Sequence, residues 1–237
     1  MSRIAIVAAL AQELGPLHQA LEDARVETHA GREFWLGRLG GHEVVMVLCR
    51  IGKVAAAITT TVLAAHYQVR AVLFTGVAGG LGEGVRVGDV VVADGLVQHD
   101  MDARPLFPRF EVPLYGRDRF EADEALSTLL LQAARQALPA GTPVHRGLVL
   151  SGDSFINSHE QVRSLRALFP QALAVEMEGA AVAQVCHDCA LPFAIVRTIS
   201  DRADDEAHVD FLRFIDETAS RYSVALVRGL LALLPRS

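Results

Sequence analysis

Cysteine is scarce in this chain of 237 residues, which contains only Cys49, Cys186 and Cys189. An odd and small number of cysteines argues against a secreted scaffold held together by disulfides. Cys186 and Cys189 form a C-x-x-C pair, which is the spacing of a redox pair or of half a zinc site. Because no second C-x-x-C and no H-x-x-x-H completes such a site, we favour the interpretation that both are small apolar residues on one helix.

Two further absences limit the partners of the chain. The sequence has no basic tract and a formal net charge of −6, so we expect no nucleic acid partner and favour a small or neutral molecule. It also has no run of about 18 consecutive apolar residues, the length that a membrane-spanning helix requires. The early apolar run over residues 4–10 is soon followed by Gln12 and Glu13, with no small-residue cleavage site. We therefore expect no signal peptide, no membrane partner and a cytoplasmic protein.

What the sequence does contain is enough apolar side chain for a sizeable core, since 51% of the residues are hydrophobic and 21% are charged. Short apolar runs typical of buried strands alternate with longer segments of helical character. Strands are expected at 4–9, 71–74, 89–93, 147–150, 173–175 and 193–199, with a hairpin over 34–48. Helices are expected at about 11–23, 53–67, 122–137, after a Ser158–Gln161 capping box, from 178, and at 211–234. The alternation predicts one α/β domain over residues 1–237, with a largely parallel sheet covered on both faces.

Residues 99–119 interrupt this alternation with an irregular stretch that contains three prolines and several large apolar side chains. Loops of this length inside a compact domain are usually functional or mobile. His99, Asp100 and Asp102 open the stretch and could offer metal ligands. A catalytic metal usually needs three ligands in a defined geometry, so we favour a locally hydrogen-bonded loop and expect no metal.

Acidic residues follow several strands, at the edge of the sheet where α/β proteins bind ligands. Glu13 follows the first strand, Glu176 and Glu178 follow another, and Asp201 follows the last. Each acid alone could be a helix cap or a solvated side chain. Acids flanked by apolar chain are costly to bury without a purpose, however, so together they predict one ligand crevice.

The glycine-rich stretch 76–80 lies at the same edge and is expected to form a turn. Its spacing, continued at Gly82 and Gly84, differs from the dinucleotide fingerprint G-x-G-x-x-G, and no Walker motif is present, so we expect no cofactor. Such a turn would let a flat ligand approach the backbone closely. Arg197 lies inside an apolar strand, and because a buried arginine needs a carboxylate partner, we expect it to pair with Glu178.

Four motifs and a final acid, taken together, resemble those of the 5′-methylthioadenosine/S-adenosylhomocysteine nucleosidases, which belong to the purine nucleoside phosphorylase group. They read IGKVA at 51–55, TGVAGGL at 75–81, SGDSFI at 151–156, VEMEG at 175–179, and ISD at 199–201. The combination in this order is specific, and the likeness extends from Ile4 to the last helix. The resemblance implies a single α/β domain around a mixed, partly closed sheet flanked by helices, which modifies the parallel sheet expected above. It also implies a homodimer.

The resemblance further implies roles for individual residues. Glu13 matches the acid that positions and activates the attacking water, and Asp201 matches the acid that protonates adenine N7. Glu178 matches the carboxylate that holds the ribose hydroxyls. The other residues implied or expected to contact the substrate are Met177 beside the ribose, Phe155 stacked on adenine, Ile156 reading the adenine edge through its backbone, Ile51 and Phe211 near the ribose and 5′ thio group, and Val77, Ala78, Gly79, Arg197 and Ser200.

These roles fit the chemistry of N-glycosidic cleavage, which leaves positive charge on the sugar and electrons on the purine. A proton delivered to N7 accepts those electrons, and general acid help of this kind contributes about 10²–10⁴ in rate. A free aspartic acid has a pKa of about 3.9, so Asp201 must lie in a dry pocket or share its proton with the purine in a tight hydrogen bond. Glu13 stays ionised, takes a proton from water and stabilises the cationic sugar.

Two departures from the family pattern concern the substrate. Val77 stands where many members have serine, which removes a direct hydroxyl contact, and the loop 103–114 differs from that of the better-known members. A similar pattern occurs in relatives that hydrolyse 6-amino-6-deoxyfutalosine, which we keep as a second substrate.

Two rival functions remain open. Phosphorylases of the same group carry arginines that grip phosphate, one of them just before the glycine turn, where this chain has Leu73-Phe74-Thr75. Phosphate needs charge-assisted donors, so hydrolysis is favoured. A nucleoside-binding module without catalysis would lack the acids, and Glu13, Glu178 and Asp201 are all present.

Overall fold

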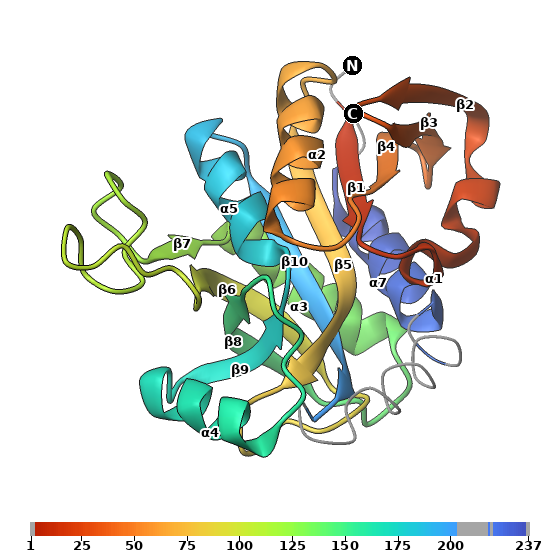
Figure 1. Ribbon diagram of the computed structural model, residues 1–237. Helices are drawn as coiled ribbons and strands as arrows, with labels where there is room; N and C mark the ends of the chain where they lie inside the picture. The colour runs from red at the N-terminus through yellow and green to blue at the C-terminus, as the bar shows by residue number, and fades with distance from the viewer. Residues whose placement is uncertain (1–2, 203–217, 219, 236–237) are drawn as a thin grey trace.

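The computed structural model describes residues 3–202, 218 and 220–235 (Figure 1). Its strands are β1 (Ile4–Ala8), β2 (Glu22–His29), β3 (Arg32–Leu39), β4 (His42–Leu48), β5 (Ala71–Gly80), β6 (Val90–Gln98), β7 (Arg119–Glu121), β8 (Val144–Ser151), β9 (Ala172–Glu176) and β10 (Phe193–Asp201). Its helical segments are α1 (Ala11–Leu14), η1 (Gly15–Ala20), α2 (Lys53–Ala65), α3 (Glu124–Ala137), α4 (His159–Leu168), α5 (Gly179–Asp188) and α7 (Ser220–Leu233).

All ten strands belong to one mixed sheet. Five of them close a ring, because β5 pairs with β10, β10 with β6, β6 with β8, β8 with β9, and β9 with β5 again. From β5 the sheet continues outward through β1, β4, β3 and β2. The pairings β10–β6 and β5–β9 are antiparallel, whereas the other three pairings of the ring are parallel. The mixed, partly closed sheet is therefore confirmed, and the largely parallel sheet expected from the strand pattern alone is wrong.

Helices cover both faces of the sheet, as predicted (Figure 1). α2 packs against α5 on one face, and α3 packs against α7 on the other. β1 lies between β4 and β5, with every residue buried, which explains its unbroken apolar sequence. Among the described residues, no helix combines the length and the apolar character needed to cross a membrane.

The first expected helix, over 11–23, is wrong. Only α1 and the 3₁₀ helix η1 form, and β2 begins at Glu22. Pro16, at the start of η1, has no N–H to continue an α-helix. β2 is an edge strand that is exposed along most of its length, so it has little of the apolar pattern that would reveal a strand.

The glycine-rich stretch also differs from its prediction, because residues 76–80 continue β5 instead of forming a turn. A Cβ atom added to Gly76 would lie 2.8 Å from the Glu13 Oε1 atom. Glycine at this position therefore allows β5 to pass close to the buried carboxylate of Glu13, and no turn is formed here.

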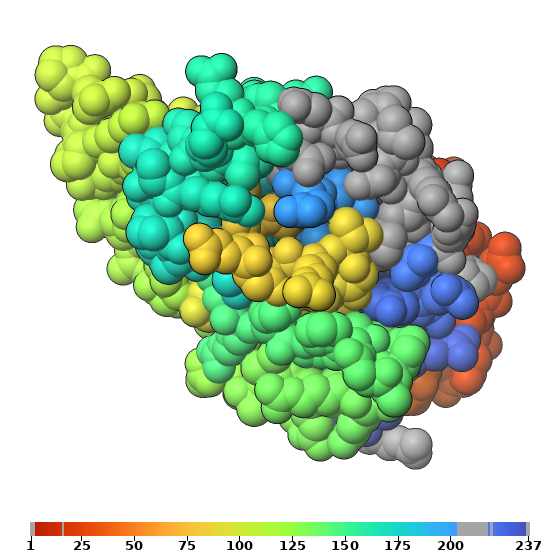
Figure 2. Space-filling view, turned by 90° about the horizontal axis from the view of Figure 1, so that it is seen from below, coloured from red at the N-terminus to blue at the C-terminus, as the bar shows by residue number. Residues whose placement is uncertain are grey.

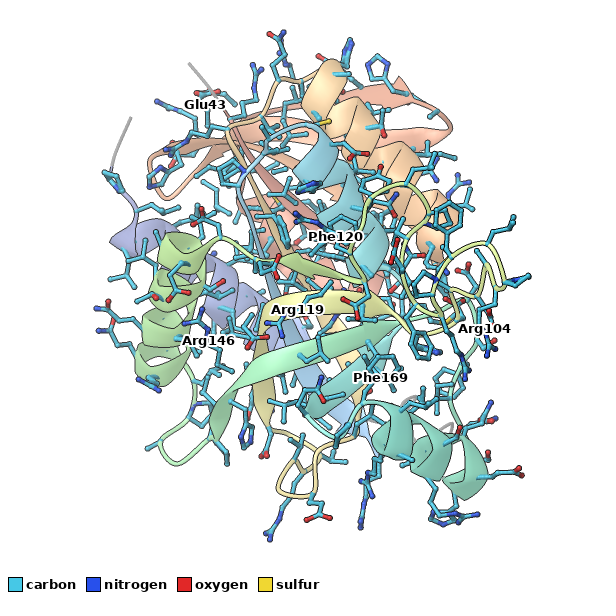
Figure 3. The ribbon with its side chains drawn as sticks, turned by 90° about the vertical axis from the view of Figure 1, so that its left-hand side faces the viewer. Glu43, Arg104, Arg119, Phe120, Arg146 and Phe169 are labelled. Carbon is cyan, nitrogen blue, oxygen red and sulfur yellow. The ribbon has the colours of Figure 1, made fainter. Side chains whose placement is uncertain are left out.

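The irregular stretch between β6 and β7 projects from the body of the molecule (Figure 1), and Arg104 lies on it (Figure 3). Leu106 is 83% exposed and Leu114 is 90% exposed. An isolated bridge between Val112 and Arg117 is the regular pairing within this stretch. The prediction of an irregular segment here is confirmed.

Candidate active site

A pocket of about 390 Å³ lies where several strands end. Its lining comes from the chain after β1, from the ends of β5, β9 and β10, and from the loop after β8. In Figure 2 the light-blue end of β10 lies in a hollow between the teal and the yellow segments. The sheet thus brings residues from distant parts of the sequence to one place.

Eleven of the thirteen predicted site residues line this pocket: Glu13, Ile51, Val77, Ala78, Gly79, Phe155, Ile156, Met177, Glu178, Ser200 and Asp201. Arg197 is not among the lining residues, and Phe211 lies outside the described residues. Sequence reasoning did not select four other lining residues, Ala9, Leu10, Ser154 and Val175, and it gave Glu176 no role. Ser154 and Val175 belong to the motifs SGDSFI and VEMEG and could have been found there, whereas Ala9 and Leu10 are marked only by their position after the first strand.

Glu13 lies in α1, just after β1, and is 3% exposed. Its carboxylate accepts three backbone hydrogen bonds, from the N–H groups of Ala9 at 2.8 Å, Leu10 at 2.9 Å and Val77 at 3.0 Å. Burial raises the pKa of Glu13, although Arg197 and these hydrogen bonds act in the opposite direction. The result is a rigidly held carboxylate with an increased affinity for a proton.

Arg197 is buried and pairs with Glu176, a residue that lines the pocket, which corrects the predicted pairing with Glu178. Its Nη2 and Nε atoms donate to Glu176 Oε2 at 2.6 and 3.2 Å, and its guanidinium lies 4.0 Å from the centre of the Phe74 ring. Burial alone would lower the pKa of Arg197, but the charge of Glu176 raises it. Glu176 also accepts hydrogen bonds from the Ser151 hydroxyl and the Gly179 N–H. The Arg197–Glu176 pair therefore connects β10, β9 and the start of α5 next to the pocket.

Glu178 stands between β9 and α5 and lines the pocket itself. It accepts a hydrogen bond from the Gly52 N–H at 2.8 Å and is 6% exposed. Burial, assisted by the negative charge of Glu176, raises the pKa of Glu178 to about 8. Its carboxyl group is therefore poised to change charge close to neutral pH.

This shift predicts that the protein loses stability as the pH rises. Glu178 in the unfolded chain ionises near its ordinary pKa of 4.5, whereas in the folded protein it ionises near about 8. Between these values the unfolded state binds fewer protons, so the unfolding free energy falls with increasing pH, by at most about 1.4 kcal/mol per pH unit from this group. Urea unfolding between about pH 6 and 8 should show a smaller decline for Glu178→Gln than for the wild type. The exposed Glu33→Gln is the control and should decline with pH as the wild type does. If the unfolding free energy of Glu178→Gln declined just as steeply, the raised pKa of Glu178 would be contradicted.

Asp201 is the last residue of β10 and is 2% exposed. A register shift between Ile199 and Asp201 places Asp201 opposite Gly79 of β5. The Ser200 hydroxyl donates to Asp201 Oδ2 at 2.7 Å, and Ile199 is fully buried. The carboxyl group of Asp201 therefore lines the pocket and is largely shielded from water.

Much of the remaining lining of the pocket is apolar. Phe155 is 40% exposed and Ile156 is 8% exposed, and both line the pocket together with Val77, Ala78 and Gly79. A partly exposed aromatic ring and a stretch of backbone with the small residues Ala78 and Gly79 suit a flat heterocycle.

The possible metal sites lie elsewhere. Asp100 accepts a hydrogen bond from Lys53, and Asp102 accepts one from Arg104, so these two acids serve different partners in the loop. Cys186 is a buried free thiol in α5, as predicted, whereas Cys189 is an exposed free thiol at the C-cap, one residue after the helix ends at Asp188. Among the described residues, one group could hold a metal ion, with ligand atoms within 4.8 Å of one another: Glu27, His29 and His66. None of the three lines the pocket.

Comparison with known proteins agrees with this geometry. A model of the family described as "Phosphorylase superfamily" matches residues 3–232. A 5′-methylthioadenosine/S-adenosylhomocysteine nucleosidase of Bacillus thuringiensis is 40% identical over 228 residues, which cover 96% of this chain and 98% of that protein. The fold class is confirmed by solved structures. The nucleosidase of Neisseria meningitidis, in complex with methylthio-immucillin-A, has a TM-score of 0.93 and 35% identity, covering 99% of this chain and all of the other.

A futalosine hydrolase mutant of Helicobacter pylori is also similar, with a TM-score of 0.89 and 32% identity over 97% of this chain and 98% of that protein. The likenesses extend over nearly the full length of each protein, and they include the strands and loops that form the pocket. The chain therefore belongs to the 5′-methylthioadenosine/S-adenosylhomocysteine nucleosidase family of the phosphorylase superfamily.

Proposed function

We propose that this chain hydrolyses the N-glycosidic bond of 5′-thio-adenosine nucleosides, methylthioadenosine and S-adenosylhomocysteine, and releases adenine and the free thioribose sugar. The observation that carries the proposal is the convergence of three buried acids, Glu13, Glu178 and Asp201, on one pocket with an apolar wall. The chemistry requires one proton donor, one base and one group for the ribose, and the pocket offers an acid for each. The full-length likeness to a nucleosidase supports the same reaction.

In this proposal Asp201 gives its proton to adenine N7, so the purine can leave as a neutral molecule. Glu13 accepts a proton from the attacking water and, as an anion, stabilises the positive charge that develops on the sugar. Its three backbone hydrogen bonds fix the carboxylate before the substrate arrives. Glu178 accepts hydrogen bonds from the ribose hydroxyls, and Phe155 stacks on the base.

Water, and not phosphate, is the nucleophile in this proposal. Among the described residues that line the pocket there is no lysine and no arginine. The nearby Arg197 is already paired with Glu176. Phosphate binding needs charge-assisted donors, so the described part of the pocket favours hydrolysis over phosphorolysis.

The rate of adenine release is therefore expected to be the same with and without phosphate. The measurement is adenine release from methylthioadenosine in phosphate-free buffer, followed by analysis of the sugar product. A sugar 1-phosphate, together with no turnover in phosphate-free buffer, would refute the assignment.

6-Amino-6-deoxyfutalosine is the second candidate substrate. The observation that favours it is the likeness to the futalosine hydrolase of Helicobacter pylori. The experiment is to offer methylthioadenosine, S-adenosylhomocysteine and 6-amino-6-deoxyfutalosine side by side and to follow adenine release. If adenine is released from the first two and not from the third, this candidate is eliminated and the main proposal stands.

We also propose that two single-domain chains form a homodimer. Val54 and Ile58 are 72% and 42% exposed and lie four residues apart on one side of α2, and Ile51, just before the helix, is 56% exposed. Leu106 and Leu114, on the irregular stretch after β6, are also exposed, and exposed apolar side chains that gather in one patch mark protein interfaces. Light scattering should therefore show 51 kDa, twice the 25.5 kDa of one chain, and Val54→Glu should shift the protein toward 25.5 kDa. A wild-type protein of 25.5 kDa would reject the dimer.

A cytoplasmic location is part of the same proposal. The buried thiols of Cys49 and Cys186 are free, as is usual in a reducing compartment. Fractionation of cells that express the native gene tests it, and recovery of the protein outside the cytoplasm would contradict it.

A further inference from the structure

Lysine occurs once in this chain. Of the 22 basic residues, 21 are arginine and one is Lys53. Lys53 is the first residue of α2, and its side chain is only 16% exposed. It does not line the pocket, and the proposed chemistry gives it no role.

The ammonium group of Lys53 is surrounded by acceptors from two other segments. Its Nζ atom donates to Asp100 Oδ1 at 2.6 Å and to Gln98 Oε1 at 3.1 Å, and it lies 3.8 Å from Asp153 Oδ2. The backbone N–H of Lys53 donates to Asp153 Oδ1 at 2.8 Å, and the N–H of Asp153 donates to Asp100 Oδ2 at 2.9 Å. These bonds join the start of α2, the end of β6 and the loop after β8 into one cluster.

The two segments that contain Lys53 and Asp153 both continue into the lining of the pocket. On one side, Asp153 is followed by residues 154–156, which include the exposed ring of Phe155. On the other side, Lys53 is preceded by Gly52, whose N–H holds Glu178, and by Ile51, which lines the pocket. The adenine side and the ribose side of the site are thus tied to each other by the backbone N–H of Lys53, which donates to Asp153, and by its ammonium group, which Asp100 links to the Asp153 N–H.

We infer that Lys53 is a positioning residue that holds the base-stacking segment 154–156 in register with the ribose-binding carboxylate of Glu178. The inference deepens the proposed function and rests on it for the identity of the ligand. Lys53 does not touch the substrate. It sets the distance between two parts of the site that must engage one nucleoside at the same time.

Lysine suits this position better than arginine. Three acceptor oxygens from three residues surround a single nitrogen, which matches a compact ammonium and not a planar guanidinium. The pair with Asp100 is partly shielded from water, so it is screened less than a surface pair. Burial opposes the ionisation of Asp100, yet the hydrogen bonds from Lys53 and the Asp153 N–H lower its pKa.

The kinetic test compares Lys53→Met with Arg146→Met. Arg146 pairs with Glu124 at the outer side of β8 and α3 (Figure 3), so its removal breaks an ion pair away from the pocket. We expect Lys53→Met to lower kcat/KM for methylthioadenosine about ten- to hundredfold, mainly through KM, and to weaken inhibition by adenine. Lys53→Arg should recover only part of the loss, and Arg146→Met should leave kcat/KM unchanged. A Lys53→Met enzyme within about twofold of the wild type would overturn the inference.

A spectroscopic test begins with the wild-type protein. Because Lys53 is the only lysine, protein made with 15N-lysine gives a single backbone amide signal, and this N–H is the one that donates to Asp153. Saturation with adenine should shift that signal, and Asp153→Asn should shift it without adenine. An amide signal that does not respond to bound adenine would also overturn the inference. Absence of any wild-type turnover would instead refute the proposed function.

Discussion

Asp201→Asn is expected to slow the turnover of methylthioadenosine at least about 10²-fold while adenine nucleosides still bind. The asparagine amide keeps the shape of the carboxyl group and its place at the end of β10, and it can still hydrogen bond to Ser200. It cannot give a proton to N7, so adenine must depart as an anion, which is a poorer leaving group than the neutral base. The reduction should appear in kcat, because the missing interaction belongs to the transition state.

The measurement pairs steady-state kinetics with calorimetric titration of adenine. The exposed Asp118→Asn serves as the matched control and should retain wild-type kcat. A thermal melting temperature close to that of the wild type shows that the variant is folded. Undiminished turnover in Asp201→Asn would show that another group donates the proton, and loss of adenine binding would assign Asp201 to recognition of the base.

Most strands were predictable because the local sequence determines them. β1 and β10 are buried along their whole length, and each contains an unbroken apolar run, which is the whole of β1 and the first four residues of β10. β2 was not predictable, since an exposed edge strand has no apolar pattern. The closure of the ring depends on the antiparallel pairing of β9 with β5 and of β6 with β10, strands that are distant in sequence. Apolar patterns carry no information on such pairing, and it was the family resemblance that implied a mixed sheet.

The site shows the same division. That acids at strand ends would meet was predictable, because the ends of β1, β9 and β10 must converge if the sheet forms. The acid that pairs with Arg197 was not predictable. Glu176 is still in β9, whereas Glu178 follows the end of the strand, so their side chains take different directions despite a spacing of two residues. The bonds of Lys53 to Asp100 and Asp153 could not be predicted either, because each joins the start of α2 to a loop that is distant in sequence.

Glu13→Gln is expected to lower turnover about 10²–10⁴-fold, because an amide cannot take a proton from water. It also removes the negative charge that faces the developing cation. Unlike Asp201→Asn, this variant should lose stability as well. The Glu13 carboxylate accepts N–H groups on both oxygens, and the amide NH₂ of glutamine would face at least one of these donors. An unsatisfied buried donor of this kind costs about 1–3 kcal/mol.

Two measurements separate these effects. Urea unfolding reports the loss of stability, and kcat measured well below the unfolding transition reports the chemistry. Glu33→Gln, which changes an exposed glutamate of β3, is the matched control and should alter neither. If Glu13→Gln were less stable and yet turned over at the wild-type rate, Glu13 would only support the fold and another group would have to activate water. If it retained stability but lost turnover, the three backbone hydrogen bonds would not hold the carboxylate in the working protein as they do in this structure.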